Sequence, residues 1–350
     1  MGDQEPESPQ RWAESSPDDP REPQRLSEVT EPVWRYVALR TLRGFMDHQC
    51  MDLAAGLTYH AVLSLFPALL AIVSLLGLFG QSGNTVSGMM DIIQHIAPGA
   101  TAASIRQPVE DLVHAPAAGL ALIGGLAGAL WAASGYVRAF ARAMNRIYGI
   151  AEGRSLVRLF GTMLGITVVY VVVVAVVSAV LVLSGPIADA IGNAIGLGGP
   201  AEVGWNILKW PAAVVLVVGL IAVLYYFTPN VRQPKFRWMS VGSSIALAVF
   251  ALATAGFGFY VGNFGHYNRT YGALGGVIIL LLWVWLLNMS LLLGAVFDAE
   301  TERGRELEAG LPAEEQIQLP PKSVAGIRKR QKRAQEDIRR ARELRRRHGR

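Results

Sequence analysis

The stretch "AAGLTYHAVLSLFPALLAIVSLLG" (Ala54–Gly77) places residues capable of chemistry inside an apolar helix of membrane-spanning length. Pro67 removes a backbone donor, which predicts a bend. His60, Ser64 and Pro67 are spaced by four and three residues, so they share one helical face beside Tyr59. Charge in hydrocarbon is costly, which makes an intramembrane His60 a functional candidate. The alternative is a neutral histidine that is hydrogen-bonded between helices, beside a proline that only fits the helix to its neighbours.

The elements that must position these residues are long and apolar. The chain is 52% hydrophobic and 17% charged, whereas soluble domains carry about 25% charged residues. About 20 mostly apolar residues cover roughly 30 Å of hydrocarbon. Six segments meet this requirement: Leu53–Phe79, Ala117–Val137, Leu159–Leu183, Ile207–Phe227, Met239–Val261 and Tyr271–Phe297. We therefore predict an all-α membrane protein with six transmembrane helices.

Basic residues gather in every second connection along the chain. They precede the first span, follow the second and the fourth, and fill the tail, while the other connections are poor in Arg and Lys. Basic residues flank the cytoplasmic ends of spans. The pattern predicts a multi-pass protein of the bacterial cytoplasmic membrane with both termini in the cytoplasm. No secretory signal peptide is expected at the start of the sequence, because residues 1–31 are acidic and rich in proline.

The flanking segments divide the chain into three parts. Residues 1–31 hold nine acids and five prolines, so we expect a disordered tail. Residues 32–300 form the membrane domain, and 301–350 form a basic cytoplasmic tail, with 13 basic and three acidic residues from Lys322 onward. Three roles are open for this tail, namely binding the anionic leaflet, reinforcing topology, or contacting nucleic-acid phosphates, the least expected.

Short amphipathic helices are predicted outside the spans. A stripe over residues 33–49 predicts a helix in the cytoplasmic interface, with packing on protein as the alternative; it consists of Trp34, Val37, Ala38, Thr41, Leu42, Phe45 and Gln49. Weaker stripes within 86–97, 105–113 and 187–195 predict short helices in the external loops. These either cap a cavity or lie in the outer interface.

Polar residues near the span ends suggest a path for an amphipathic molecule. We predict substrate-path candidates at Tyr59, His60, Ser64, Pro67 and Asn288, in a groove walled by the first, fourth and sixth spans. Basic residues can gather anionic headgroups at its inner mouth. These headgroup-binding candidates are Arg138, Arg142, Arg146, Arg232, Lys235 and Arg237.

Four blocks in order carry a family resemblance. They are "AAGLTYHAVLSLFPALL", "SGYVRAFARAMNRIYGIAEGRS", "LYYFTPN" and "YGALGGVIILLLWVWLLNMSLLLGAVFDAE". Over about Val33–Glu300 the chain resembles the YihY/BrkB family of multi-pass bacterial membrane proteins. The resemblance implies a bacterial envelope protein, with links in the family to serum resistance and lipid handling, and an old label of ribonuclease BN. It marks as family-motif residues Asn145, Pro229, Asn230, Tyr271, Gly272 and Gly294.

The sequence argues against enzyme chemistry. The six histidines are scattered and Cys50 is the one cysteine, so neither a CxxC pair nor a metal-binding Cys/His cluster occurs, and we expect neither a metal site nor a cofactor. No GxxxxGK[ST] motif occurs, so no ATP site is built in. We expect a transporter or translocator of an amphipathic or lipidic substrate, with membrane lipids as partners and no nucleic acid. The alternative is a scaffold for an envelope complex, and a membrane-bound ribonuclease is the least expected. An oligomer or an envelope partner protein stays open.

Overall fold

In the part of the chain that the computed structural model describes, the regular secondary structure is helical. That part comprises residues 19–23, 28–79, 118–182, 198–233, 236–264 and 273–348. Within the helices, the side chains of 65–79, 118–122, 174–182, 198–206, 236–240, 262–264 and 273–274 lie outside the described set. One isolated antiparallel β-bridge joins Val231 to Pro321. An all-helical protein is therefore confirmed for these residues.

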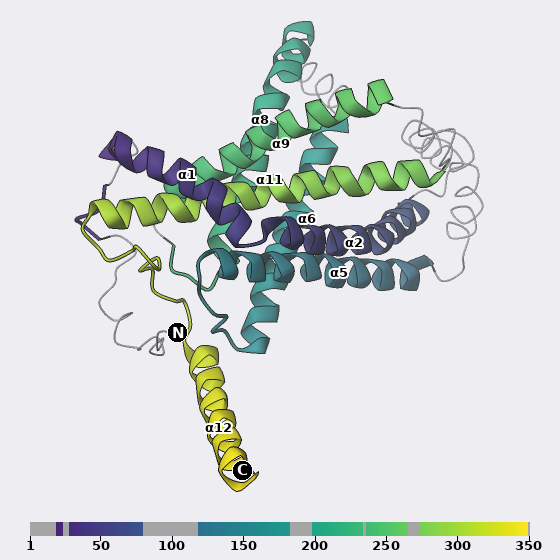
Figure 1. The fold of residues 1–350 in the computed structure, drawn as a ribbon. Coiled ribbons are helices and arrows are strands. Elements are labelled where there is room, and N and C mark those ends of the chain that lie inside the picture. The colour runs from purple at the N-terminus through teal and green to yellow at the C-terminus, as the bar shows by residue number, and fades with distance from the viewer. Residues whose placement is uncertain are drawn as a thin grey trace. The chain divides into compact units, whose positions relative to one another are not determined.

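The described part of each predicted span lies in a long helix (Figure 1). These helices are α2 (Cys50–Phe79), α5 (Ala118–Ile147), α6 (Leu156–Val182), α8 (Gly198–Phe227), α9 (Phe236–Phe264) and α11 (Ala273–Glu308). Two further helices, α1 (Glu31–Asp47) and α12 (Ala325–His348), flank them. Among the described residues, four stretches are long and apolar enough to cross a membrane: Leu156–Val173, Ile207–Phe227, Val241–Val261 and Gly275–Glu308. The amphipathic helices predicted in the external loops, and the motif residues Tyr271 and Gly272, lie outside the described residues.

Two compact units make up the chain. The first consists of Met1–Leu53, Phe140–Ala251 and Met289–Arg350, and the second of Ala54–Ala139 and Leu252–Asn288. The boundaries between them fall inside α2, α5, α9 and α11. α11 also continues as one helix through the predicted domain boundary at residue 300, ending at Glu308.

Two helices of the first unit end in the same glycine motif. After α5, the N–H of Gly149 donates to Arg146 O and that of Ile150 to Asn145 O. After α11, Gly310 and Leu311 repeat this pattern. Gly149 and Gly310 have φ of 64° and 76°, the left-handed conformation that glycine adopts at low cost. The glycine that follows each of these two helices therefore determines where the helix ends.

Helix α1 packs one face on the C-terminal part of α11, where the two cross in Figure 1. Trp34 stacks on Phe297 with ring centroids 6.2 Å apart, and Val37, Thr41 and Gly44 are buried. Of the predicted apolar stripe, Val37 and Thr41 lie on this contact face, whereas Ala38 and Leu42 are exposed, because the face is centred on the 37–41–44 line. A second apolar face is left exposed, and it consists of Tyr36, Leu39, Leu42 and Met46.

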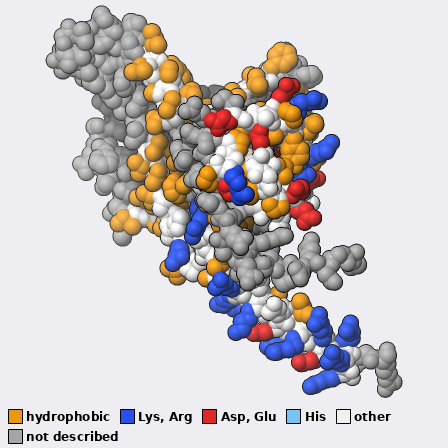
Figure 2. Space-filling model, turned by 90° about the vertical axis from the view of Figure 1, so that its left-hand side faces the viewer, with side chains coloured by type: hydrophobic (Ala, Val, Ile, Leu, Met, Phe, Trp, Pro, Cys, Tyr) orange, Lys and Arg blue, Asp and Glu red, His pale blue; other side chains and the backbone are white. Residues whose placement is uncertain are grey.

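Helix α12 gathers the basic residues of the tail. Figure 2 shows Lys and Arg side chains along its length. Only Ile327 near its start is buried. Composition alone predicts a basic tail and no helix, yet the run of Arg, Lys, Gln, Glu and Ala consists of strong helix formers.

Candidate functional site

An apolar groove lies between two helices of the second unit. Its volume is about 550 Å³, and it is lined by Ala55, Thr58, Tyr59, Val62 and Leu63 of α2 and by Leu281, Leu282 and Trp285 of α11. Ligand pockets in proteins span about 300–1,000 Å³. The lining residues of α2 recur at three- and four-residue spacing, which is the periodicity of one helical face. The groove can therefore hold an apolar chain along the two helices.

A chain of hydrogen bonds meets the groove at Thr58. Asn288 is fully buried; its Oδ1 accepts a bond of 2.8 Å from the Tyr136 hydroxyl, and its Nδ2 donates to Thr58 Oγ1 at 3.1 Å. The Thr58 hydroxyl donates to Ala54 O at 2.8 Å. The bonds join α2, α5 and α11 within the second unit. They give the otherwise apolar groove a fixed polar edge.

The predicted substrate-path residues of α2 do not all line the groove. Tyr59 lines the groove and is 62% exposed, and its ring meets that of His60 edge-on at 5.5 Å. His60 and Ser64 are not among the lining residues, and the Ser64 hydroxyl donates to Ala61 O at 2.6 Å. Pro67 lies within α2, but its side chain is outside the described set, so the bend stays a prediction.

The predicted headgroup-binding residues have different surroundings. Arg138 is half-buried in the second unit. In the first unit Arg142, Arg146 and Arg232 are exposed, and Arg146 Nη2 donates to Gln49 Oε1 at 2.6 Å. Lys235 and the side chain of Arg237 lie outside the described residues.

The family-motif asparagines form a buried polar junction in the first unit. The backbone N–H of Asn230 donates to Asn145 Oδ1 at 2.7 Å, and Asn145 Nδ2 donates to Glu152 Oε2 at 3.0 Å. Asn230 Nδ2 donates to Ala151 O at 3.0 Å and to Ser323 O at 2.9 Å, while its Oδ1 accepts from the Ser323 N–H. Every polar atom of the Asn230 side chain is thus used to join three chain segments.

An ion pair completes this polar junction. Arg154 binds Glu152 through Nε at 2.8 Å and Nη2 at 2.7 Å, and it also donates to Thr228 O at 2.7 Å. Burial raises the pKa of Glu152, but hydrogen bonds from Arg154 and Asn145 outweigh it, so this pKa lies below its usual value. The carboxylate is therefore charged at neutral pH and locks the loop after α5.

The C-terminal segment docks on the junction through residues that the sequence alone did not single out. Lys322 Nζ donates to Tyr226 O at 2.7 Å and lies 5.5 Å from that ring. Burial lowers the pKa of Lys322 to about 8, with a further lowering by Arg154. A Cβ on Gly153 would collide with the carbonyl of Ser323, so this contact requires glycine. The "AEGRS" run was visible in the sequence, but its partner 170 residues away was not.

The last motif residues sit at close helix contacts or tight turns. A Cβ on Gly294 would collide with Gly242 O and would lie 2.7 Å from the Tyr225 hydroxyl. Pro229 stands between the buried residues Thr228 and Asn230 at the end of α8. The described motif residues thus have packing and hydrogen-bonding roles in the first unit.

Beyond the junction, buried charges surround the end of α11. Arg305 pairs with Glu22 at 2.9 Å and with Glu302, and Arg303 pairs with Glu300 at 2.9 Å. Glu22 belongs to the segment predicted as a disordered tail, yet its side chain is 1% exposed. The pair ties this part of the N-terminal segment to the first unit.

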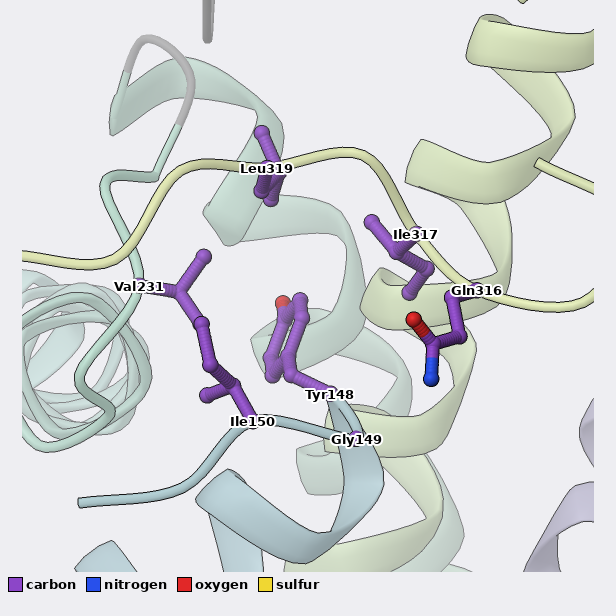
Figure 3. A pocket seen from close by; sticks show the side chains of 7 residues that line it. All are labelled: Tyr148, Gly149, Ile150, Val231, Gln316, Ile317 and Leu319. Carbon is purple, nitrogen blue, oxygen red and sulfur yellow. The ribbon is translucent and has the colours of Figure 1, made fainter. Parts of the chain in front are cut away.

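A small cavity beside the junction is shown in Figure 3, with a volume of about 20 Å³. It is lined by Tyr148, Gly149, Ile150, Val231, Gln316, Ile317 and Leu319. This is room for about one water molecule. Within the described part of the chain, no group of three or more His, Cys, Asp or Glu is placed to hold a metal ion. The groove is therefore the better candidate for a substrate site.

Comparisons with known proteins agree with the membrane architecture. The family described as Virulence factor BrkB matches residues 41–317. Putative ribonuclease-like protein YfkH of Bacillus subtilis (strain 168) is 28% identical over 260 residues, which cover 74% of this chain and 93% of YfkH. A UPF0761 membrane protein of Alkalilimnicola ehrlichii is 32% identical over 264 residues, 75% of this chain and 56% of that protein.

A UPF0761 membrane protein of Xanthomonas campestris pv. campestris (strain B100) is 29% identical over 261 residues, 72% of this chain and 57% of its own length. The chain thus spans little more than half the length of these UPF0761 relatives. No solved structure matches it. The family match includes the junction asparagines and the groove residues of α2 and α11. The chain is a membrane protein that belongs to the Virulence factor BrkB family.

Proposed function

We propose that this protein transports or translocates an amphipathic or lipidic envelope substrate along the groove between α2 and α11. The observation that carries this proposal is the apolar groove of about 550 Å³ with its polar edge at Thr58. Polar groups at membrane depth are expensive unless they are hydrogen-bonded. The hydrogen-bonded chain of Thr58, Asn288 and Tyr136 places polar groups beside the apolar groove. An amphipathic molecule requires both kinds of surface.

The proposed setting is the bacterial cytoplasmic membrane, with six spans and both termini in the cytoplasm. In this orientation the basic face of α12 and the exposed apolar face of α1 lie at the cytoplasmic leaflet. Tyr36, Leu39, Leu42 and Met46 would enter the interface, and the arginines of α12 would face anionic headgroups. Membrane lipids are therefore the partners that we propose, rather than nucleic acid.

We further propose that the chain is not an enzyme and uses no built-in ATP site. The sequence has no GxxxxGK[ST] motif. The printed name of YfkH describes that protein as ribonuclease-like. For this chain, a metal-dependent nuclease would need converging ligands. Metal-dependent RNA cleavage that copurifies through several columns and vanishes on substituting His60 would contradict the proposal.

A reconstitution experiment tests transport. The purified full chain is placed in liposomes that contain a fluorescent lipid, and movement between leaflets is followed with an impermeant quencher. Leu282→Trp, which adds bulk inside the groove, should slow the movement at least several-fold. Leu280→Trp is the matched control, because Leu280 lies on the same helix but outside the groove lining and is 40% exposed. Folded protein that moves no lipid in any form would favour the scaffold instead.

A further inference from the structure

The carboxyl group of Asp298 lies where α9 and α11 make close contact within the first unit. Its Oδ1 accepts a hydrogen bond of 2.8 Å from the backbone N–H of Gly242. A Cβ on Gly242 would lie 2.3 Å from Asp298 Cγ, so only a glycine lets the carboxyl reach the backbone of α9. One turn earlier on α11, Gly294 likewise approaches Gly242 O. The carboxyl is therefore fixed at the contact between the two helices.

This carboxyl is buried, and one of its two oxygens has no partner. Asp298 is 7% exposed, and its Oδ2 makes no hydrogen bond with any of the described residues. The ion pairs found among those residues go to other carboxyls. A buried carboxylate that has one hydrogen bond and no cation is costly, whereas the protonated acid carries no charge to desolvate. The geometry therefore suits a carboxylic acid that holds a proton.

Asp298 is the first of three carboxyls on one face of α11. Glu302 and Glu306 follow at four-residue spacing, about 6 Å apart along the helix axis. Glu302 pairs with Arg305, and both Glu306 oxygens accept from the backbone N–H of Gln318 at 2.9 and 3.0 Å. Specific partners thus stabilise a negative charge at these two positions. Like charges at this spacing repel, so a further negative charge at Asp298 is opposed.

Tyr148 and Gln233 face the carboxyls from other elements of the first unit. The Tyr148 hydroxyl donates to Gln233 Oε1 at 3.4 Å, and Gln233 Nε2 is buried without a hydrogen-bond partner in the described part of the chain. Burial raises the pKa of Tyr148, and the carboxylates of Asp298, Glu302 and Glu306 raise it further. Tyr148 therefore stays protonated at neutral pH, so the carboxyls are the groups here that can exchange a proton.

The other charges near this end of α11 form pairs of their own. Arg303 pairs with Glu300 at 2.9 Å, and Arg305 also pairs with Glu22 at 2.9 Å. On the side of α9, the described residues 241–251 include no ionisable side chain. No described cation therefore pairs with the carboxyl at the α9 contact.

We propose that Asp298 is the proton-binding site that couples this protein to a proton gradient. Binding converts its carboxylate to the neutral acid and release reverses this, with no other bond made or broken. Asp298 directly follows the predicted span Tyr271–Phe297, and ionisable residues in the spans of pumps and transporters commonly form proton relays. A chain without a GxxxxGK[ST] motif can use a proton gradient as its energy source. That the proton drives substrate movement rests on the proposed function; that Asp298 binds it does not.

Infrared spectroscopy of the purified full chain in detergent tests proton binding. We expect the wild type at neutral pH to show the carbonyl band of a buried, protonated carboxylic acid, and alkaline titration should remove it. Asp298→Asn keeps an oxygen that can accept the Gly242 N–H, so the fold should persist while the band is lost. Asp337→Asn is the matched control, because it removes an exposed aspartate of α12 and should retain the band.

Reconstituted vesicles test the coupling. The distribution of a fluorescent phosphatidylglycerol between the leaflets is measured with an impermeant quencher, while potassium and valinomycin clamp the membrane potential. If one proton moves with each lipid, a gradient of one pH unit can shift the ratio between the leaflets by up to about tenfold. Asp298→Asn should abolish this shift, and Asp337→Asn should preserve it.

Each outcome decides one claim. A band that survives in Asp298→Asn, or a wild type without such a band at neutral pH, overturns the proton site. The wild-type measurement decides this even if the variant does not fold. Proton binding without any lipid movement refutes the proposed function and leaves the site standing. Lipid movement whose final distribution ignores the pH gradient refutes the coupling and leaves the proposed function standing.

Discussion

Asn145 and Asn230 are 85 residues apart and bind each other directly, since the backbone N–H of Asn230 donates to Asn145 Oδ1 at 2.7 Å. The remaining polar atoms of both side chains reach Glu152, Ala151 and Ser323. The ends of α5 and α8 and the segment before α12 are therefore joined by two amides.

The first prediction concerns these amides. Asn230→Ala leaves a buried backbone carbonyl and the Ser323 N–H without the partner they use now, which costs about 1–3 kcal/mol per buried group. We expect a lower unfolding temperature for the detergent-solubilised protein in a thermal melt. Gln335→Ala, at an exposed position of α12, should leave it unchanged. Equal melting of all three proteins would show that the junction adds no stability.

The second prediction concerns Gly153. Alanine there would collide with the backbone carbonyl of Ser323, which cannot rotate away as a flexible side chain can. Gly153→Ala should release the segment before α12 and speed its cleavage by trypsin. Gly161→Ala in α6 is the matched control: a Cβ there meets nothing within 4 Å, so the change should be neutral or stabilise by about 0.5–1 kcal/mol. Equal cleavage rates would contradict the docking.

The third prediction concerns pH and Lys322. Burial lowers the pKa of this amine to about 8 from 10.5. Between these values the unfolded chain binds more protons than the folded one, so the Lys322 contribution to stability rises with pH in this window. Below about pH 8 both states are protonated and the contribution is constant. The difference in unfolding temperature between wild type and Lys322→Gln should therefore shift in favour of wild type from pH 8 to pH 10. A difference independent of pH would contradict the buried position.

The fourth prediction concerns topology. Cysteine introduced at Thr101 or Gly196, in a Cys50→Ser background, should react with an impermeant thiol reagent applied to intact cells. Cysteine at Ser155, which is exposed on the first unit, should react only after the membrane is opened. Burial raises the pKa of Cys50 to about 12, so the native thiol should label slowly even in the wild type. Labelling of Ser155→Cys in intact cells would invert the proposed orientation.

Local properties of the sequence were sufficient to locate the helices. Apolar runs such as Leu159–Leu183 predict α6 to within a few residues, because a helix satisfies its own backbone and needs only length and apolarity. Gly149 and Gly310 likewise mark helix ends by their own conformational freedom. The Asn145 and Asn230 motif residues were found through the family resemblance, without any indication that they touch.

Which faces of those helices line the groove, pack on a neighbour or form ion pairs became clear only from the tertiary structure. Tyr59 lines the groove while His60 lies beside Gly135, although both stand in the same apolar helix. Glu22 is buried against Arg305, and Ser323 closes on Gly153, although both came from segments predicted to be tails. These contacts join residues far apart in the chain, so they depend on how helices pack and not on the periodicity of any one of them. Length and apolarity determine that a helix forms, whereas the shapes of its neighbours determine which of its side chains are buried, paired or left open to a ligand.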